Sequence, residues 1–536
     1  MSYAFGIDLG TTYSCISYVD EFGKAVVLKN SNGDHTTPSV VFVESASNIV
    51  VGEEAKRAVE VEQDKTVQFI KRKMGKEENT VILNGTTYTA QEISSYILKK
   101  LVDDANNELQ QTGVLKAGER ITDVVITCPA YFGMNEKNAT MEAGKLAGLN
   151  VLDIINEPTA AAISYSDTVR DQEETVLVYA LGGGTFDITV MNIKGGNITV
   201  ICTGGDDKLG GKDWDQALVN YIIEEFESEN GEDLTEDDEA MATLMLDVET
   251  WKKSLTSREK VNINVRAMGA RLRQELTREK YEEITRHLLT RTKDLLDNIL
   301  ETSASYGYPL SRIDKILLVG GSSRMPQVAR MIEEDYGVKP SLQDPDEAVA
   351  KGAAKYALDR SKYQTIVNEE ARRTGKSVEE IKMEGKIVAG GMKITNVLSC
   401  TYGIKVMEGG TDRYIISNFL KVNSPLPARE TKEFYTVVDG QSGVNLNLYE
   451  TRSTEDSIDL EDREPLTVIE MRFNNSVPQD TPIRITLTLD NSGILHVQAT
   501  EGHSGSKLDT TFKLSQQMSA AEMRQAEKRV ANASVE

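Results

Sequence analysis

Two patterns of apolar residues divide the chain. Up to about residue 358, short apolar runs alternate with helical stretches. The runs include Asp123–Thr127, Thr175–Tyr179 and Ile316–Val319, and the helical stretches include Ala90–Leu109, Trp214–Glu227 and Arg278–Leu300. This alternation is typical of α/β domains, in which helices cover a sheet.

From about residue 402, strand-like runs follow one another at short spacing and turn residues separate them. The runs are Thr431–Val438, Val444–Tyr449, Leu466–Phe473, Ile483–Leu489, Leu495–Thr500 and Lys507–Leu514. In Ile483–Leu489 every second residue is apolar, so these side chains share one face of a strand. The pattern predicts an antiparallel β-sandwich over residues 402–515.

A charged segment lies between these two regions, and one helical stretch follows them. Residues 359–401 hold the helical stretch Arg360–Lys386 and then two glycines, which indicates an insertion and a flexible linker. Near residue 519, Ser519 and Glu522 have the spacing of a capping box. We therefore expect a helix over Ser519–Val535.

The size and charge of the chain narrow its class. Its 536 residues exceed what one core holds, so two to four domains are expected. The net charge of −24 argues against nucleic acid or an anionic membrane as a partner, because both need a basic face. No apolar run reaches 18 residues, the N-terminus does not resemble a secretion signal, and the cysteines are scattered. We expect a cytoplasmic protein.

A glycine-rich turn occurs twice. Residues 5–12 read F-G-I-D-L-G-T-T and residues 178–185 read V-Y-A-L-G-G-G-T. Such turns let backbone N–H groups approach phosphate closely, because glycine has no Cβ. When the turns are aligned on Leu-Gly, Asp8 falls opposite Ala180. The repeat suggests a duplicated fold closing on one nucleotide, with half of a metal-organising carboxylate pair missing.

A third turn, Gly320-Gly321-Ser322-Ser323-Arg324, follows an apolar run and suits a base or a ribose, with Arg324 placed to stack on a purine. Taken singly, each of the three turns is also explained as an ordinary hairpin or strand-to-helix turn. The P-loop class is excluded, because the chain has no G-x-x-x-x-G-K-[ST].

Together these motifs resemble the actin-like ATPase domain of the 70-kDa heat-shock (DnaK-type) chaperone family. The matching stretches over residues 2–358 are G-I-D-L-G-T-T-Y-S, F-I-K-R-K-M-G, V-I-T-C-P-A-Y-F, I-I-N-E-P-T-A-A-A, L-G-G-G-T-F-D, K-L-G-G-K-D-W-D, L-V-G-G-S-S-R-M-P and D-P-D-E-A-V-A-K-G-A-A. The later β region matches through D-G-Q-S-G-V and N-S-G-I-L-H-V-Q-A. The resemblance implies a duplicated actin-like α/β ATPase domain at 1–358, a β-sandwich at 402–515 and the start of a truncated helical lid at 516–536.

The resemblance also implies roles for particular residues, with ATP or ADP and Mg²⁺ as cofactors and K⁺ as a further ion. The residues implied in catalysis are Asp8, Lys71, Glu157, Thr185 and Asp187. Asp8 and Asp187 are the implied metal residues, mainly through water. The residues implied in nucleotide binding are Gly10, Thr11, Thr12, Tyr13, Gly182, Gly183, Gly184, Thr185, Gly210, Glu249, Lys252, Thr256, Gly320, Gly321, Ser322, Arg324 and Asp346.

In the β region, the family holds an extended apolar peptide by its backbone, with one pocket for a Leu-like side chain. The matching positions are Ile404, Met407, Phe434, Val437, Val444, Leu446 and Ile483, some of which are also explained as sandwich core. The partners implied are unfolded apolar polypeptides, a J-domain cochaperone and a nucleotide-exchange factor.

The chain departs from the family at Ala180, where the family has an aspartate. Loss of this carboxylate should slow hydrolysis while sparing nucleotide binding, because the attacking water loses an orienting partner. The expected function is therefore an ATP-dependent peptide-binding chaperone with slowed ATPase activity. The alternatives are a phosphotransferase of the sugar-kinase type, which shares the actin-like core, and a nucleotide-binding scaffold without catalysis.

Overall fold

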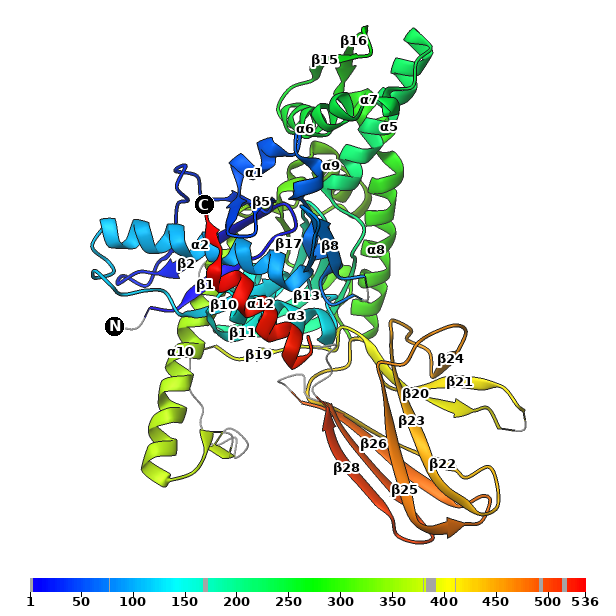
Figure 1. Cartoon of the computed structure of the whole chain (residues 1–536). Coiled ribbons are helices and arrows are strands. Elements are labelled where there is room, and N and C mark those ends of the chain that lie inside the picture. Colours follow the sequence, from blue (N-terminus) through cyan, green and yellow to red (C-terminus); the bar gives the residue numbers. More distant parts are fainter. Residues whose placement is uncertain are drawn as a thin grey trace.

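The computed structural model describes residues 3–76, 78–166, 172–378, 380–381, 392–409, 411–490, 495–512 and 518–536 (Figure 1). Parts of three expected features lie outside these residues: the end of the charged stretch with Gly390 and Gly391, the turn at 491–493, and the end of the last predicted strand run. Among the described helices, none is long and apolar enough to cross a membrane.

Two sheets with the same strand order form the N-terminal domain. The first has the order β11-β10-β1-β2-β3, and the second has β18-β17-β12-β13-β14, with β19 added beside β14. In each sheet the three strands that come first in the chain (β1, β2 and β3, or β12, β13 and β14) pair antiparallel. The two later strands (β10 and β11, or β17 and β18) are added in parallel. The first sheet's strands are β1 (Phe5–Asp8), β2 (Tyr13–Val19), β3 (Ala25–Val27), β10 (Asp123–Cys128) and β11 (Asn150–Asn156), with β4 (Thr37–Pro38) beside β2.

The second sheet's strands are β12 (Glu173–Leu181), β13 (Phe186–Lys194), β14 (Asn197–Asp206), β17 (Lys315–Val319), β18 (Ser341–Leu342) and β19 (Ile394–Thr395). The shared order shows that the fold is duplicated, as the repeated turn suggested.

Two helices, α4 (Glu157–Ser166) and α10 (Ala348–Thr374), share a core of small residues with both sheets. Their backbones approach closely: a Cβ added at Gly352 would lie 1.7 Å from the carbonyl oxygen of Ala160. A Cβ at Gly6 of β1 would likewise lie 2.1 Å from the backbone nitrogen of Ala354. Glycine and alanine at these positions let the two halves pack as one body.

Further helices and short strands complete each half of the domain. In the first half they are α1 (Glu53–Ala58), α2 (Ala90–Gln111) and α3 (Met134–Leu146), with short strands β5 (Val41–Ser45), β6 (Asn48–Val51), β7 (Thr66–Val67), β8 (Thr80–Leu83) and β9 (Thr86–Thr89). In the second half they are α5 (Gly211–Asn230), α6 (Asp238–Leu255), α7 (Arg278–Ile284), α8 (Arg286–Ser305) and α9 (Pro326–Tyr336), with the hairpin β15 (Lys260–Ala267) and β16 (Ala270–Thr277). The 3-10 helices are Gln63–Lys65, Ile70–Lys73, Leu234–Glu236, Leu310–Arg312 and Gly321–Arg324.

Two expected boundaries differ from the structure. The stretch Arg278–Leu300 is two helices, since Thr285 ends α7 and begins α8. Helix α10 runs through residue 358 without a break, so the charged segment begins inside a helix that also packs on the core of the N-terminal domain. Beyond residue 360, Val367, Ala371 and Ile381 form a small cluster of their own, which holds the projecting end of α10 together.

A second domain of two packed sheets begins at residue 401. One sheet has the order β24-β21-β20-β23-β25 and the other β22-β26-β27-β28. Alternate residues of the strands face a shared core, which includes Ile485 and Leu487. The strands are β20 (Thr401–Met407), β21 (Tyr414–Leu420), β22 (Ala428–Tyr435), β23 (Gln441–Thr451), β24 (Ser457–Asp459), β25 (Thr467–Val477), β26 (Pro482–Leu489), β27 (Leu495–Glu501) and β28 (Lys507–Phe512).

The linker and the sandwich are docked against the N-terminal domain (Figure 1). Strand β19 of the linker pairs in parallel with the edge of β14. Met392 and Ile394 pack against the core that α4 and α10 share with the two sheets. The Ser399 hydroxyl donates to the Phe132 carbonyl at 3.0 Å. The Asn423 side-chain oxygen accepts a buried hydrogen bond from the Thr203 N–H at 2.9 Å. The strand pairing and these hydrogen bonds fix the orientation of the two domains.

The last segment lies on the N-terminal domain and not on the sandwich. Helix α12 (Ala520–Asn532) packs Ala526 and Val530 into the core under α2 and α3, and its N-cap is Ser519 with Glu522 in a capping box. Strand β29 (Ser534–Val535) then pairs in parallel with β6. The red helix in Figure 1 therefore adds to the first half of the N-terminal domain.

A buried ion pair fixes α12. The carboxylate of Glu92 is fully buried and lies 2.7 Å from Nε of Arg529 and 2.6 Å from its Nη2. Arg529 also lies over the ring of Tyr88, at 5.7 Å from its centroid. Lys99 donates from α2 to the carbonyls of Val530 and Ala533, which the helix end leaves free.

We predict that Arg529→Leu lowers the free energy of unfolding by about 2 kcal/mol, because Glu92 keeps its buried charge and loses its partner. Arg524→Leu on the exposed face of the same helix is the matched control and should change it by less than about 0.5 kcal/mol. Urea unfolding of both variants measures the difference. Equal stabilities would show that the ion pair does not hold α12.

Candidate functional site

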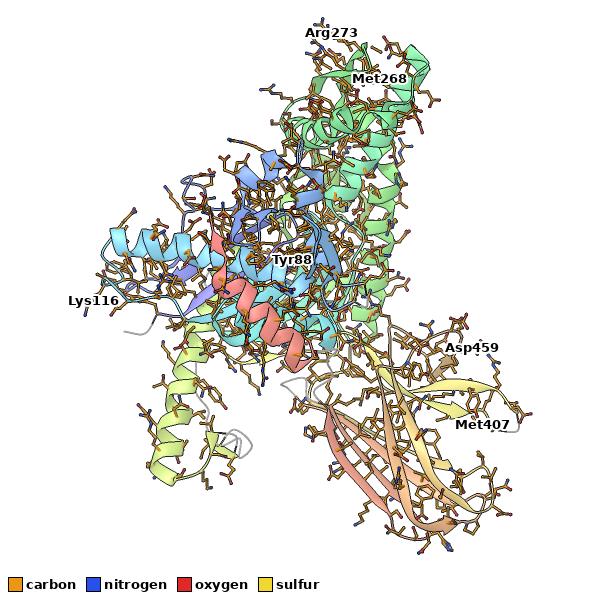
Figure 2. All side chains as sticks on the ribbon, viewed as in Figure 1. Tyr88, Lys116, Met268, Arg273, Met407 and Asp459 are labelled. Carbon is orange, nitrogen blue, oxygen red and sulfur yellow. The ribbon has the colours of Figure 1, made fainter. Side chains whose placement is uncertain are left out.

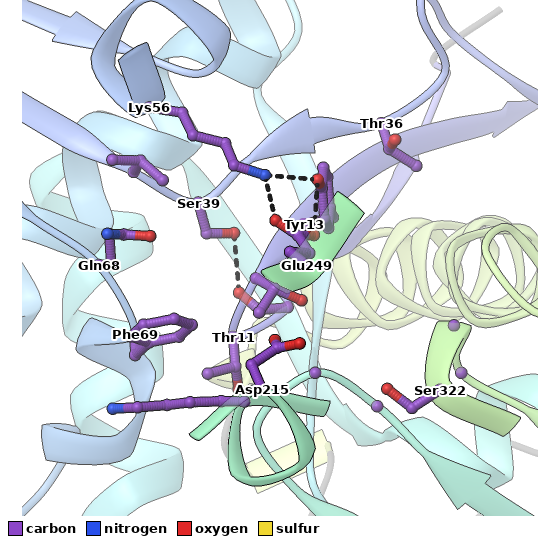
Figure 3. Close-up of a pocket in the computed structure, with 18 of the residues that line it drawn as sticks. Thr11, Tyr13, Thr36, Ser39, Lys56, Gln68, Phe69, Asp215, Glu249 and Ser322 are labelled. Atoms are coloured by element: carbon purple, nitrogen blue, oxygen red, sulfur yellow. Dashed lines mark hydrogen bonds and ion pairs between the residues drawn. The ribbon is translucent and has the colours of Figure 1, made fainter. Parts of the chain in front are cut away.

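A cavity of about 830 Å³ lies between the two halves of the N-terminal domain. The turn after β1 and the turn after β12 form opposite sides of it, and α6 and the 3-10 helix Gly321–Arg324 contribute further walls (Figure 3). Each turn lies at the end of the first strand of its sheet, so the duplication itself brings the two turns face to face.

Most of the nucleotide-site residues predicted from the sequence line this cavity. They are Asp8, Gly10, Thr11, Thr12, Tyr13, Lys71, Glu157, Gly182, Gly183, Thr185, Glu249, Lys252, Thr256, Gly320, Gly321, Ser322, Arg324 and Asp346. Gly184, Gly210 and Asp187 do not line it.

The two glycines outside the wall have a packing role. A Cβ at Gly184 would lie 2.3 Å from the Thr11 side chain, and one at Gly210 would lie 2.6 Å from the backbone of Gly184. Gly183 faces Thr12 in the same way, at 2.1 Å. These glycines allow the two phosphate-type turns to touch, which an alanine would prevent.

The floor of the cavity holds a compact charged group. Nζ of Lys71 lies 2.5 Å from Oε1 of Glu157 and also donates to the Leu9 carbonyl. Burial and then the charge of Glu157 raise the pKa of Asp8 from 3.8 to about 7, although Lys71 and Thr127 act to lower it. Burial by itself lowers the pKa of Lys71, but Glu157 and Asp8 outweigh it and the pKa is raised. A cation therefore stays at the centre of this floor.

Asp187 lies behind the wall. Its Oδ1 accepts from the Ala130 N–H at 2.8 Å, and its buried Oδ2 has no hydrogen-bond partner within the described chain. Burial and the charge of Glu157 raise its pKa well above the usual value. Its register partner across β12 and β13 is Ala180, whose methyl group does line the cavity. The cavity wall thus has a methyl group next to an unsatisfied carboxylate oxygen.

A polar network joins the two halves across the cavity mouth. Lys56 of α1 pairs with Glu249 of α6, and its Nζ lies 3.0 Å from the Tyr13 hydroxyl. Lys253 also binds both Glu249, at 2.7 Å, and the Tyr13 hydroxyl, at 2.9 Å. Burial would raise the pKa of Glu249, but the two lysines lower it to about 2. Figure 3 shows Lys56, Tyr13 and Glu249 joined in this way.

The sequence reasoning missed several lining residues. Lys56 and Lys253 stand outside the quoted motifs. Lys253 follows Glu249 by four residues on α6, a helical spacing that the sequence itself shows, whereas no pattern in the sequence pairs Lys56 with Glu249. Phe69 and Asp215 do fall inside quoted motifs, and both line the cavity. Phe69 adopts a left-handed backbone at φ 59° with the Lys212 ammonium 4.3 Å from its ring centroid, and such strain often marks functional sites.

This arrangement fits a phosphorylated ligand with a bound cation. Two glycine turns offer backbone N–H groups and threonine hydroxyls, and Lys71 supplies a fixed positive charge. Asp8 and the free oxygen of Asp187 are hard oxygen donors of the kind that hydrated Mg²⁺ prefers. No group of three or more His, Cys, Asp or Glu side chains in the described chain forms a metal cage.

Comparisons with known proteins identify the family of the chain. The sequence profile of the Hsp70 protein family matches residues 4–83 and 77–536. The chaperone protein DnaK of Thermosipho melanesiensis is 37% identical over 512 residues, which cover 94% of this chain and 79% of that protein. The chain belongs to the Hsp70 family. As a member it is an ATP-dependent chaperone, and the family binds ATP or ADP with Mg²⁺.

The sandwich positions that match the Hsp70 peptide site are divided between core and surface. Ile404, Leu446 and Ile483 are buried in the sandwich core. Phe434 and Val444 are half-buried at its edge. Met407 and Val437 are 36% and 47% exposed, and Figure 2 shows Met407 at the free end of the domain.

We predict that Lys56→Met speeds nucleotide release about fivefold, because it removes about 1 kcal/mol of pairing across the cavity mouth. Arg57→Met is the matched control, since Arg57 lies on the same helix and pairs with exposed Glu53 and Glu54 only. Stopped-flow release of a fluorescent ATP analogue measures both. Equal release rates in the two variants would show that the pairing of Lys56 with Glu249 does not slow nucleotide release.

Proposed function

We propose that this chain binds extended apolar polypeptides in its sandwich and that ATP in the cavity switches their affinity. The observation that carries the proposal is a single segment that touches both sites. The Ala130 N–H of this segment binds Asp187 beside the nucleotide cavity, and the Phe132 carbonyl binds Ser399 of the linker. Met134, two residues on, packs against the sandwich core. A shift at Asp187 therefore moves the surface on which the sandwich docks.

In the proposed reaction, Lys71 stabilises the charge that develops on the γ-phosphate, and Glu157 fixes the position of Lys71. Thr185 and the backbone of Gly183 hold the phosphates from the second half, and Asp8 with Asp187 holds the metal through water. Mg²⁺ held there would neutralise phosphate charge and act as a Lewis acid on the phosphoryl group. Burial and Glu157 raise the pKa of Asp8 to about 7, and a bound cation would shift this carboxyl back toward its ionised form.

Hydrolysis is slowed by Ala180 in this proposal. Its methyl group lines the cavity beside Val319 and Asp187, where a carboxylate would reach the water and metal shell. Glycines, threonines and the adenosine-side residues remain, so nucleotide affinity is largely kept. The chain would then stay longer in the ATP state, in which the sandwich is docked and exchanges peptide quickly.

The peptide would lie along the exposed end of the sandwich. Met407 and Val437, with the neighbouring exposed Tyr435 and Val438, offer apolar contacts there, and strand edges can hydrogen-bond to an extended backbone. The proposed partners are unfolded polypeptides, a J-domain cochaperone and a nucleotide-exchange factor. In this structure α12 and β29 bind the ATPase domain, so among the described helices α12 does not cover the exposed end of the sandwich.

We predict that Ala180→Asp speeds single-turnover ATP hydrolysis at least tenfold, because an orienting carboxylate is restored. Ala180→Asn is the control of the same shape without charge and should stay near the rate of this chain. Release of a labelled apolar heptapeptide, followed in parallel, should be accelerated by ATP in all three proteins.

Two outcomes would count against the proposal. Equal hydrolysis by this chain and Ala180→Asp would remove the role given to position 180. Peptide release that ignores ATP would favour a nucleotide-binding scaffold without a chaperone cycle.

A further inference from the structure

Two carboxylates face each other where the sandwich meets the ATPase domain. Glu136 lies in the first turn of α3, and Glu450 lies at the end of β23. Glu450 packs onto the start of α3: a Cβ added at Gly133, the N-cap of this helix, would lie 2.4 Å from Oε1 of Glu450. Oε2 of Glu136 is buried and has no hydrogen-bond partner in the part of the chain that the structure describes.

The cations near this pair are held by other groups. Lys76 forms an ion pair with Asp207 at 2.6 Å, and Arg452 lies over the ring of Tyr131 at 5.2 Å from its centroid. Both cations act to lower the pKa of Glu136, but burial and the charge of Glu450 outweigh them.

The other polar neighbours do not supply a counter-charge. Oε2 of Glu450 accepts from the Tyr402 hydroxyl at 2.9 Å. Burial, with the charge of Glu450, raises the pKa values of Tyr402 and Cys400, so both stay neutral. One extra negative charge is left at a buried contact.

We propose that Glu136 and Glu450 form a proton-linked latch, in which the docked domains hold one proton on this pair and release it when they separate. The two residues come from different domains, so their proximity exists only in the docked arrangement. The latch requires only that the two domains separate and dock again, and it is independent of what the sandwich binds.

The titration of Glu136 gives the direction of the effect. Burial at the interface and then the charge of Glu450 raise its pKa from 4.5 to about 7. After separation the carboxyl returns to water and to an ordinary pKa. The contribution to docking is therefore fully present below about pH 4.5 and is lost as the pH rises through about 7. Lowering the pH within this window strengthens docking. Above the window, the contribution of Glu136 to docking no longer changes with pH.

Hydrogen exchange of the linker tests the latch. Strand β19 pairs with β14, and the Ile198 N–H donates to the Lys393 carbonyl, so exchange of the Ile198 amide and of the amides of Ile394 and Thr395 reports the opening of the docked state. After correction for intrinsic exchange, protection in the whole chain should fall about tenfold between pH 6 and pH 8, both without nucleotide and with saturating ATP. Glu136→Gln should remove this slope and keep protection at or above the pH 6 value.

Two further variants make the test specific. Glu450→Gln should keep a smaller slope, because burial of Glu136 remains while the opposing charge is gone. Glu464→Gln, an exposed carboxylate of the sandwich outside the interface, should keep the full slope. The proposal is overturned if Glu136→Gln and the unchanged chain have the same slope, or if protection rises with pH.

Discussion

The contact between the two glycine turns is the constraint on which the rest of this molecule depends. Gly183 and Gly184 lie where any Cβ would collide with the side chains of Thr12 and Thr11, so these glycines let the two turns approach closely. This contact sets the width of the cavity and brings Asp8 to the same floor as Lys71 and Glu157. The small residues of α4 and α10 allow the same closeness behind the cavity.

Burial then decides the electrostatics. The same carboxyl chemistry gives a pKa near 7 at Asp8 and near 2 at Glu249, because the first is crowded by Glu157 and the second is held between two lysines. Asp187 keeps an unsatisfied oxygen beside the methyl group of Ala180. The site is therefore rich in negative charge at the point where a metal ion is expected, and cationic where the two halves close over the ligand.

The chain also uses its last segments as parts of the ATPase domain. The linker extends one sheet as β19, and β29 extends the edge of β6. Both attachments are strand additions, which satisfy backbone groups without requiring particular side chains. The sandwich is consequently held by the linker on one side and by a small polar contact around Glu136 and Glu450 on the other.

The sequence by itself determined the family, the duplication and most of the cavity wall, because glycine turns after apolar strands are local features. It also indicated the sandwich, whose alternating strands face one core, and the start of α12, whose capping box is read from four residues. Only the tertiary structure paired Lys56 with Glu249, since residues from opposite lobes carry no shared local pattern. The same holds for the place of α12 on α2 and α3 and for the meeting of Glu136 with Glu450. Partners of long-range contacts are chosen by packing, which a linear pattern of polar and apolar residues does not encode.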